Sequence, residues 1–337
     1  NPLFRSVFQS SRLYLLPVLR LFLIKCATFA MALTLLAYGL DYLVQEGIKK
    51  VNFLNVEKWQ EITQGGIDAQ VLIVGSSRAI DHFDTRVIEE QTGKTAYNLG
   101  IDGITYPYGK LILDLYLEHN RPPEQLIWSL DYHSFQPDEE FENLDQLVPF
   151  REYAQVREML RISDRSWQEF RLPLYRYSQT PSMKIQGLLG YVGLRKREKS
   201  LIKGFRPKDK HWEQAVFDLR KARNPNGIAY EVKGEIFADF LNLNRVLQQQ
   251  GIQQSWVMTP YYSEFNAMIT TRSQILDRLN QASKELQIPF LDYSDHPISQ
   301  DTLHFYNVTH LSKKGVERFM GEWIGKNGRM KLEIENE

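Results

Sequence analysis

The sequence from residue 70 to residue 325 alternates short apolar runs with segments of helical periodicity. The first run, Gln70-Val71-Leu72-Ile73-Val74, is typical of a strand buried on both faces of a sheet. We expect strands at 70–74, 95–98, 125–131, 253–258 and 288–292, and helices near 84–91, 106–119, 233–250, 268–287 and 312–325. This alternation predicts an α/β fold with a mostly parallel sheet and helices on both faces, a three-layer α/β/α arrangement.

A pair of serines directly follows the first expected strand, in Val74-Gly75-Ser76-Ser77-Arg78. Gly75 permits a sharp exit from the strand, and a helical segment follows. A hydroxyl at this turn lies at the carboxyl edge of the sheet, where open α/β folds place their sites. The alternative is that the two serines only cap a helix or turn the chain.

A second short polar segment lies near the C-terminus, in Asn307-Val308-Thr309-His310-Leu311-Ser312. It places a histidine at the start of the last expected helix. A serine at a strand end and a late histidine are the residue types of a nucleophile and its general base. The two segments together therefore predict a serine nucleophile, Ser77, with His310 as its base.

The two segments resemble the first and last blocks of the SGNH (GDSL-type) hydrolase superfamily. Ser77 falls at the family's nucleophile, Ser76 at its Asp, and His310 at its base. A third block, Tyr97-Asn98-Leu99-Gly100, matches the family's second strand end. The resemblance implies a flavodoxin-like SGNH domain whose oxyanion hole uses the N–H groups of Ser77 and Gly100.

The combination of these blocks with an apolar N-terminal segment is most similar to one branch of the superfamily. That branch contains the membrane-anchored D-alanine transfer protein of teichoic acid synthesis and polysaccharide O-acetylation proteins. Its members work on the outer side of the cytoplasmic membrane, often beside a multi-spanning O-acyltransferase. The resemblance implies acyl chemistry on a cell-envelope glycopolymer or an acylated lipid carrier, without a cofactor.

The chain departs from the family pattern at two places. The acid three residues before the histidine is Asn307, which accepts a hydrogen bond but does not carry the charge that stabilises an imidazolium; Asp292, Asp295 and Asp301 are nearby substitutes. The Gly-x-Asn-Asp block is also missing after the third strand, and Asp131 stands there instead. We consider Asp131 and Arg78 as substrate-binding residues, against capping or ion pairing as the alternative.

These residues leave two functions open. The first is an acyl esterase or O-acyltransferase that works through a Ser-His acyl-enzyme. The alternative is a catalytically impaired pseudoenzyme that binds the glycopolymer or scaffolds a membrane O-acyltransferase, which Asn307 favours. The other histidines lack the spacing of a metal site, so we expect no metal. His82 is expected at the surface.

The segment from Leu21 to Val44 is nearly all apolar and predicts a retained transmembrane anchor that places the chain in the lipid bilayer. Basic residues precede it: Arg5, Arg12, Arg20 and Lys25. The positive-inside rule then predicts a cytoplasmic N-terminus and an extracytoplasmic main domain, periplasmic or on the cell surface. The alternative is a buried amphipathic helix.

The single cysteine, Cys26, lies within the segment, so the main domain forms no disulfide.

Composition and domain boundaries complete the prediction. Lys plus Arg equals Asp plus Glu, at 41 each, so net charge does not favour nucleic acid. We expect a cytoplasmic stub and anchor at 1–48, a linker at 49–68, an SGNH-like domain at 69–330 with an insertion at about 136–226, and a tail at 331–337. A basic stretch runs from Arg195 to Lys210, either as a solvated loop or as a contact for anionic lipid or glycopolymer.

Overall fold

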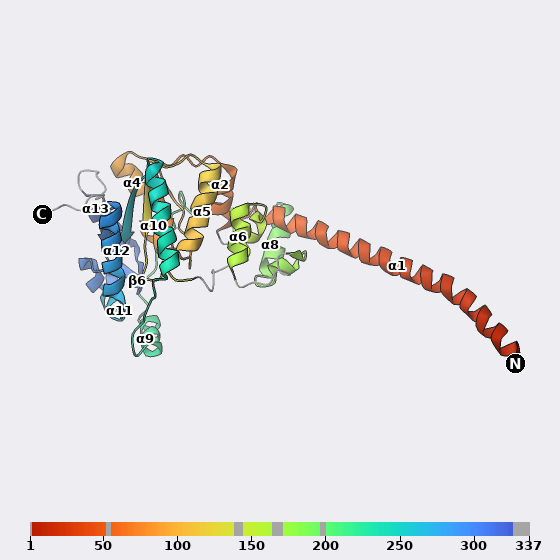
Figure 1. Cartoon of the computed structure of the whole chain (residues 1–337). Coiled ribbons are helices and arrows are strands. Elements are labelled where there is room, and N and C mark those ends of the chain that lie inside the picture. The colour runs from red at the N-terminus through yellow and green to blue at the C-terminus, as the bar shows by residue number, and fades with distance from the viewer. Residues whose placement is uncertain (1, 52–54, 138–143, 164–170, 196–199, 326–337) are drawn as a thin grey trace. The chain divides into compact units, whose positions relative to one another are not determined.

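A parallel sheet carries the candidate site, as the computed structural model shows (Figure 1). The structure describes residues 2–51, 55–137, 144–163, 171–195 and 200–325. The strands are β1 (Val71–Gly75), β2 (Ala96–Asn98), β3 (Gln125–Ser129), β4 (Gln253–Met258) and β5 (Phe290–Asp292). They form one five-stranded sheet in the order β2-β1-β3-β4-β5, and every neighbouring pair is parallel. The predicted α/β class with a mostly parallel sheet is confirmed.

Helices connect the strands and pack on them. Contacts join α2, α5 and α10 in a row, and α5 and α10 also contact β1 and β4 (Figure 1). A separate set of contacts joins α3 to β1 and α13 to α3. The helices of this part are α2 (Val56–Gln64), α3 (Ser77–His82), α4 (Thr85–Thr92), α5 (Tyr106–His119), α6 (Ala154–Ile162), α9 (Gln214–Arg223), α10 (Gly234–Gln249), α11 (Ser263–Ala267), α12 (Arg272–Leu286) and α13 (Lys313–Trp323).

The short elements in the described part of the chain are η1 (Leu144–Phe150), η2 (Tyr175–Tyr177), η3 (Pro297–Gln300), η4 (Thr302–His304) and the strands β6 (Phe305–Asn307) and β7 (His310–Leu311). The last two strands pair as an antiparallel hairpin. The hairpin differs from the prediction, because His310 lies on β7 and the following helix begins only at Lys313, capped by the Ser312 side chain. The helix expected at 268–287 is found as α12, which begins only at Arg272, and the short α11 before it was not predicted.

The chain divides into two compact units. One unit holds residues 1–51 and 166–196, and the other holds 52–165 and 197–337. The expected linker at 49–68 contains α2, whose Val56, Trp59 and Ile62 are fully buried. Only the middle of the expected insertion at 136–226 groups with the N-terminal helix, since α6 and α9 belong to the other unit. The tail at 331–337 lies outside the described residues.

Within the described residues, the first unit contains α1 (Pro2–Ile48), η2 and α8 (Ser182–Tyr191). The stretch Pro17–Ile48 of α1 is long and apolar enough to cross a membrane. The end of α1 packs on α8, and the buried Asp41 pairs with Arg176, with Nε and Oδ1 3.2 Å apart. Asp41 also accepts a hydrogen bond from the Leu174 N–H at 2.8 Å. The single charged residue in the second half of the apolar segment is thus neutralised by the segment 171–195.

Candidate functional site

The end of β1 aims Ser77 at the carboxyl edge of the sheet. A side chain at Gly75 would place its Cβ 2.5 Å from the Ser129 carbonyl oxygen on β3, so only glycine allows this approach of the strands. Ser76 caps α3, and its Oγ accepts a hydrogen bond from Arg78 N–H at 3.2 Å. Ser77 is the first residue of α3, so its N–H has no acceptor within the helix.

The β6–β7 hairpin brings His310 to this serine across 233 residues of sequence. His310 Nε2 lies 2.8 Å from Ser77 Oγ, and His310 Nδ1 lies 3.0 Å from Asn307 Oδ1. An amide oxygen only accepts, so this contact favours the tautomer with the proton on Nδ1. Nε2 is then free to accept the serine proton. The three residues assigned from the sequence to nucleophile, base and acid position therefore lie in one hydrogen-bonded line.

Asn307 Oδ1 also organises the turn that carries the histidine. It accepts hydrogen bonds from the backbone N–H groups of Thr309, at 3.0 Å, and His310, at 2.9 Å. Thr309 Oγ1 lies 3.0 Å from His310 Nδ1 and supplies a second oxygen there. The amide at the acid position thus holds both the backbone and the ring of the histidine.

Burial dominates the electrostatics of His310. It lowers the pKa of the imidazole to about 4, the buried Asp81 opposes this shift, and the cations of Arg78 and Lys208 add to it. The ring is therefore neutral at pH 7, as a general base requires. The Tyr306 ring stacks on it with centroids 5.3 Å apart.

An ion cluster behind Tyr306 was not anticipated from the sequence. The Tyr306 hydroxyl donates to Asp81 Oδ2 at 2.8 Å, and Arg206 Nε lies 2.7 Å from Asp81 Oδ1. Arg206 also pairs with Asp102, and Lys208 Nζ lies 3.1 Å from Asp81 Oδ2. Asp81 is 225 residues from Tyr306 in sequence, so no local pattern could have found this cluster.

Several cations of the predicted basic stretch form ion pairs with carboxylates of the protein. Lys203 pairs with Glu89 at 2.6 Å, and Arg206 and Lys208 are paired with the carboxylates of the cluster. Arg195 is exposed, whereas Lys196, Arg197 and Lys199 lie outside the described residues. The stretch is therefore not one free basic surface.

Gly100 lies beside α3, where a Cβ would come within 2.5 Å of the Ile80 nitrogen. Its N–H, predicted for the oxyanion hole, donates to Asn98 Oδ1 at 2.9 Å. The fully buried Lys58 donates to the Gly100 carbonyl, and burial lowers the pKa of Lys58 to about 7. An oxyanion at Ser77 would have to share the Gly100 N–H with Asn98.

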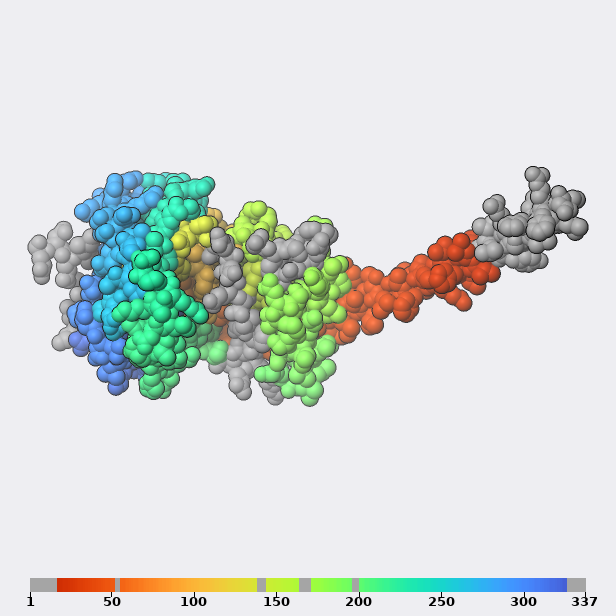
Figure 2. Space-filling view, turned by 90° about the horizontal axis from the view of Figure 1, so that it is seen from below, coloured from red at the N-terminus to blue at the C-terminus, as the bar shows by residue number. Residues whose placement is uncertain are grey.

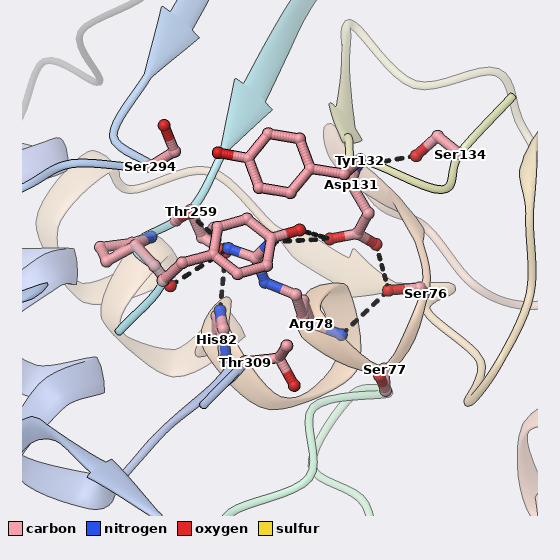
Figure 3. Close-up of polar contacts among 12 residues, drawn as sticks. Ser76, Ser77, Arg78, His82, Asp131, Tyr132, Ser134, Thr259, Ser294 and Thr309 are labelled. Atoms are coloured by element: carbon pink, nitrogen blue, oxygen red, sulfur yellow. Dashed lines mark hydrogen bonds and ion pairs between the residues drawn. The ribbon is translucent and has the colours of Figure 1, made fainter. Parts of the chain in front are cut away.

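Arg78 and Asp131 form a buried ion pair, with Nη1 and Oδ1 2.9 Å apart (Figure 3). Asp131 also accepts hydrogen bonds from Ser76 and Tyr261, and the Arg78 guanidinium stacks 3.3 Å from the Tyr261 ring centroid. Burial alone would raise the pKa of Asp131, but the Arg78 charge holds it below its ordinary value. Both residues were considered for substrate binding; Arg78 also lines the cavity at Ser77, and a role of either residue toward a substrate stays a prediction.

The side chain of His82 is fully buried, contrary to the surface position expected for it. Its Nδ1 lies 2.8 Å from Thr259 Oγ1 (Figure 3). Its Nε2 accepts the Leu311 N–H at 3.0 Å. Burial lowers the pKa of His82 well below its ordinary value, so the ring is neutral. His82 therefore joins α3 to the strand that carries His310.

The carboxylates expected to replace the missing acid are used elsewhere. Asp292 accepts the Ser294 N–H and Asp301 the Leu303 N–H, each at 2.8 Å, while Asp295 is exposed. The His310 nitrogens meet Ser77, Asn307 and Thr309 instead. Asp81 is the carboxylate with the largest effect on the histidine.

A cavity of about 440 Å³ opens in front of Ser77 and His310. Its wall combines aromatic rings with cations: Tyr132, Tyr230, Tyr261, Phe265, Tyr306, Lys208, Lys210 and Arg220. A hollow of about 540 Å³ lies at the opposite ends of β3 and β4 and is lined largely by glutamines. Only the former has a nucleophile and a base, so we take it as the candidate site. Within the described residues, no group of three or more His, Cys, Asp or Glu side chains could hold a metal.

Searches against protein-family models and curated proteins return no match to this sequence. The geometry of the site is therefore the basis for assigning a function.

Proposed function

We propose that this protein is a membrane-anchored SGNH-type acyl esterase or O-acyltransferase that acts on a cell-envelope glycopolymer. The single observation that carries the proposal is the line from Ser77 Oγ through the His310 ring to Asn307, with contacts of 2.8 and 3.0 Å. The strand order β2-β1-β3-β4-β5 supports a three-layer flavodoxin-like domain. In this proposal α1 spans the membrane with its N-terminus in the cytoplasm, and the domain with the sheet is extracytoplasmic.

The proposed reaction starts with proton transfer from Ser77 Oγ to His310 Nε2. The serine oxygen forms a bond to the carbonyl carbon of an ester or thioester, and the carbonyl electron pair moves to its oxygen. The intermediate then collapses, and the leaving alkoxide or thiolate takes the proton from His310. A water molecule or a glycopolymer hydroxyl attacks the acyl-enzyme in the same way and regenerates the serine. Water gives an esterase, and the hydroxyl gives a transferase.

The Ser77 N–H, at the start of α3, is the first proposed oxyanion donor. The Gly100 N–H is the second proposed donor. It would donate to the oxyanion and to Asn98 Oδ1 at the same time. The buried Lys58 positions this turn through the Gly100 carbonyl.

Labelling by a fluorophosphonate tests the proposal, because only an activated serine reacts quickly. The full chain in detergent should be labelled at Ser77, and Ser77→Ala and His310→Ala should abolish labelling. Ser76→Ala is the matched control: it removes the neighbouring hydroxyl and a helix cap, and labelling should persist. Labelling that survives in Ser77→Ala, or that is absent from folded wild-type protein, would refute the acyl-enzyme.

A scaffold without catalysis is the second candidate function. Two observations favour it: the neutral Asn307 at the acid position, and the Gly100 N–H already bonded to Asn98. A folded wild-type protein that is not labelled but co-purifies with a membrane acyltransferase would support this candidate.

A further inference from the structure

Helix α8 has two opposite apolar faces. Met183, Gly187 and Gly190 are buried and follow each other at steps of four and three residues. The exposed Ile185, Leu188 and Val192 have the same periodicity, displaced by half a turn. An apolar helix face is normally covered by protein or by lipid, but the protein covers only one of the two apolar faces of α8.

The covered face of α8 packs closely on the end of α1. A Cβ on Gly187 would lie 2.5 Å from the Val44 carbonyl oxygen, and one on Gly190 would collide with the Gly47 carbonyl. Small residues of this kind let two helix backbones approach each other, as they do in membrane proteins. The position of α8 along α1 is thus fixed at Val44 to Val51.

The exposed face of α8 is large and continues past its end. Ile185 is 62% exposed, Val192 63% and Leu194 78%. Figure 2 shows the green atoms of this segment at the surface directly beside the red atoms of α1. Two further apolar side chains of the same unit, Leu172 and Tyr175, are also half exposed.

The position of the exposed α8 face along the axis of α1 indicates that lipid covers this face. The part of α1 between Lys25 and Asp41 contains no charged residue and ends at Leu40. Val44 follows four residues later, about 6 Å along the helix axis. The headgroup layer adds roughly 5 to 8 Å to each side of the hydrocarbon core. The exposed face of α8 therefore starts at the depth where the bilayer changes from acyl chains to headgroups.

The residues around this level are those of a membrane interface. Tyr38 and Tyr42 are exposed on α1, and Tyr175 and Tyr191 are exposed on the packed segment. Lys50 Nζ lies 4.8 Å from the Tyr191 ring centroid, and Arg195 is exposed after α8. Tyrosines gather at membrane interfaces, and lysine and arginine reach from there to lipid phosphates.

We propose that residues 182–195 form an interfacial collar on the membrane anchor, with Ile185, Leu188, Val192 and Leu194 inserted between the lipids of the leaflet from which α1 emerges. The occupant of the exposed face is the bilayer itself. This proposal rests on α1 as a spanning helix and is independent of the chemistry at Ser77.

Lipid-attached quenchers test the depth of the collar. The full chain carries Cys26→Ser and either Val192→Cys or the matched control Leu303→Cys, which is 55% exposed in the other unit. Each cysteine is labelled with an environment-sensitive fluorophore and reconstituted into phosphatidylcholine–phosphatidylglycerol vesicles. Doxyl lipids labelled near the headgroup should quench the Val192 probe at least twofold more than the Leu303 probe.

Two results would overturn the proposal. Equal quenching of the two probes would show that lipid does not cover α8. Stronger quenching of the Val192 probe by doxyl groups deep in the chains than by those near the headgroup would place the segment in the hydrocarbon instead of the interface. Fluorophosphonate labelling of Ser77 in the same vesicles reports the proposed catalytic function separately.

Discussion

Asn307 holds the His310 ring but leaves it a weak base. A carboxylate at this position would accept the same hydrogen bonds and stabilise the imidazolium. We expect Asn307→Asp to raise the pKa of His310 from about 4 and to speed Ser77 labelling about tenfold or more. The measurement is the labelling rate from pH 4 to pH 8, in which the acidic limb should move to higher pH.

Asn307→Ala is the control for this prediction, since it removes the hydrogen bonds without adding charge. Its labelling should be slower than that of wild type at every pH. A slower rate in Asn307→Asp as well would mean that the neutral amide is required, and would contradict the prediction.

Arg78 and Asp131, which were considered as substrate ligands, form a buried ion pair. Asp131→Asn removes one charge of the pair and leaves Arg78 uncompensated among buried side chains. We expect a loss of about 3–5 kcal/mol in the free energy of unfolding. Glu285→Gln breaks the exposed pair with Arg245 and should cost less than about 1 kcal/mol. Urea denaturation of both variants checks this, and equal losses would contradict it.

The turn between β2 and α5 depends on Gly100 through its contact with α3. Gly100→Ala would place a methyl group 2.5 Å from the Ile80 nitrogen, which is backbone and cannot rotate away. We expect it to destabilise the protein and to slow Ser77 labelling, because the turn must move away from α3. Gly321→Ala, in the last turn of α13 with open space around it, is the matched control and should stabilise the protein by less than about 1 kcal/mol. Thermal unfolding of both variants is the measurement.

Elements with strong local periodicity could be predicted from the sequence. The strand expected at 253–258 and the helix expected at 106–119 are found with those bounds. The missed elements are short or depend on distant partners. The six-residue α3 is too short for a periodic signal, and the β6–β7 hairpin is fixed by contacts with α3. Helix α2 lies in the segment expected to be a linker, 49–68. It was missed because its apolar face is buried by contacts with α5 and η1, which are distant in sequence.

The site could be predicted only in part, for a similar reason. Ser77, His310 and Asn307 occupy recognisable local patterns, and the structure brings them together. Asp81 and Lys58 have no local pattern that marks them. They act through residues far along the chain, Tyr306 and Gly100, and only the folded sheet edge places them beside the site.

At the scale of the whole chain, the division into two units separates the proposed membrane anchor from the proposed catalytic site. All residues of the proposed Ser-His line belong to the unit with the sheet, whereas the apolar surfaces of α1 and α8 belong to the other. Each function can therefore be tested by substitutions that leave the other unit intact.

The unit with the sheet should lose stability in mild acid because it buries two neutral histidines. The pKa of His310 is lowered to about 4, and that of His82 is well below its usual 6.5, both through burial. Between pH 6.5 and pH 4 the unfolded chain therefore binds more protons than the folded one, and stability falls as pH falls through this window. His310 alone should account for a loss of up to about 3 kcal/mol, complete near pH 4.

Urea denaturation of the full chain in detergent, followed at pH 7.5, 6, 5 and 4.5, measures this loss. His310→Gln keeps a polar side chain of similar size but does not titrate, so its stability should fall less steeply over the same range. The stability curves of wild type and His310→Gln should diverge most between pH 6 and pH 4.5. In this range His310 is protonated in the unfolded chain but stays neutral in the folded protein. Parallel curves would show that His310 is accessible to protons in the folded protein, and would contradict the neutral, buried base on which the proposed mechanism depends.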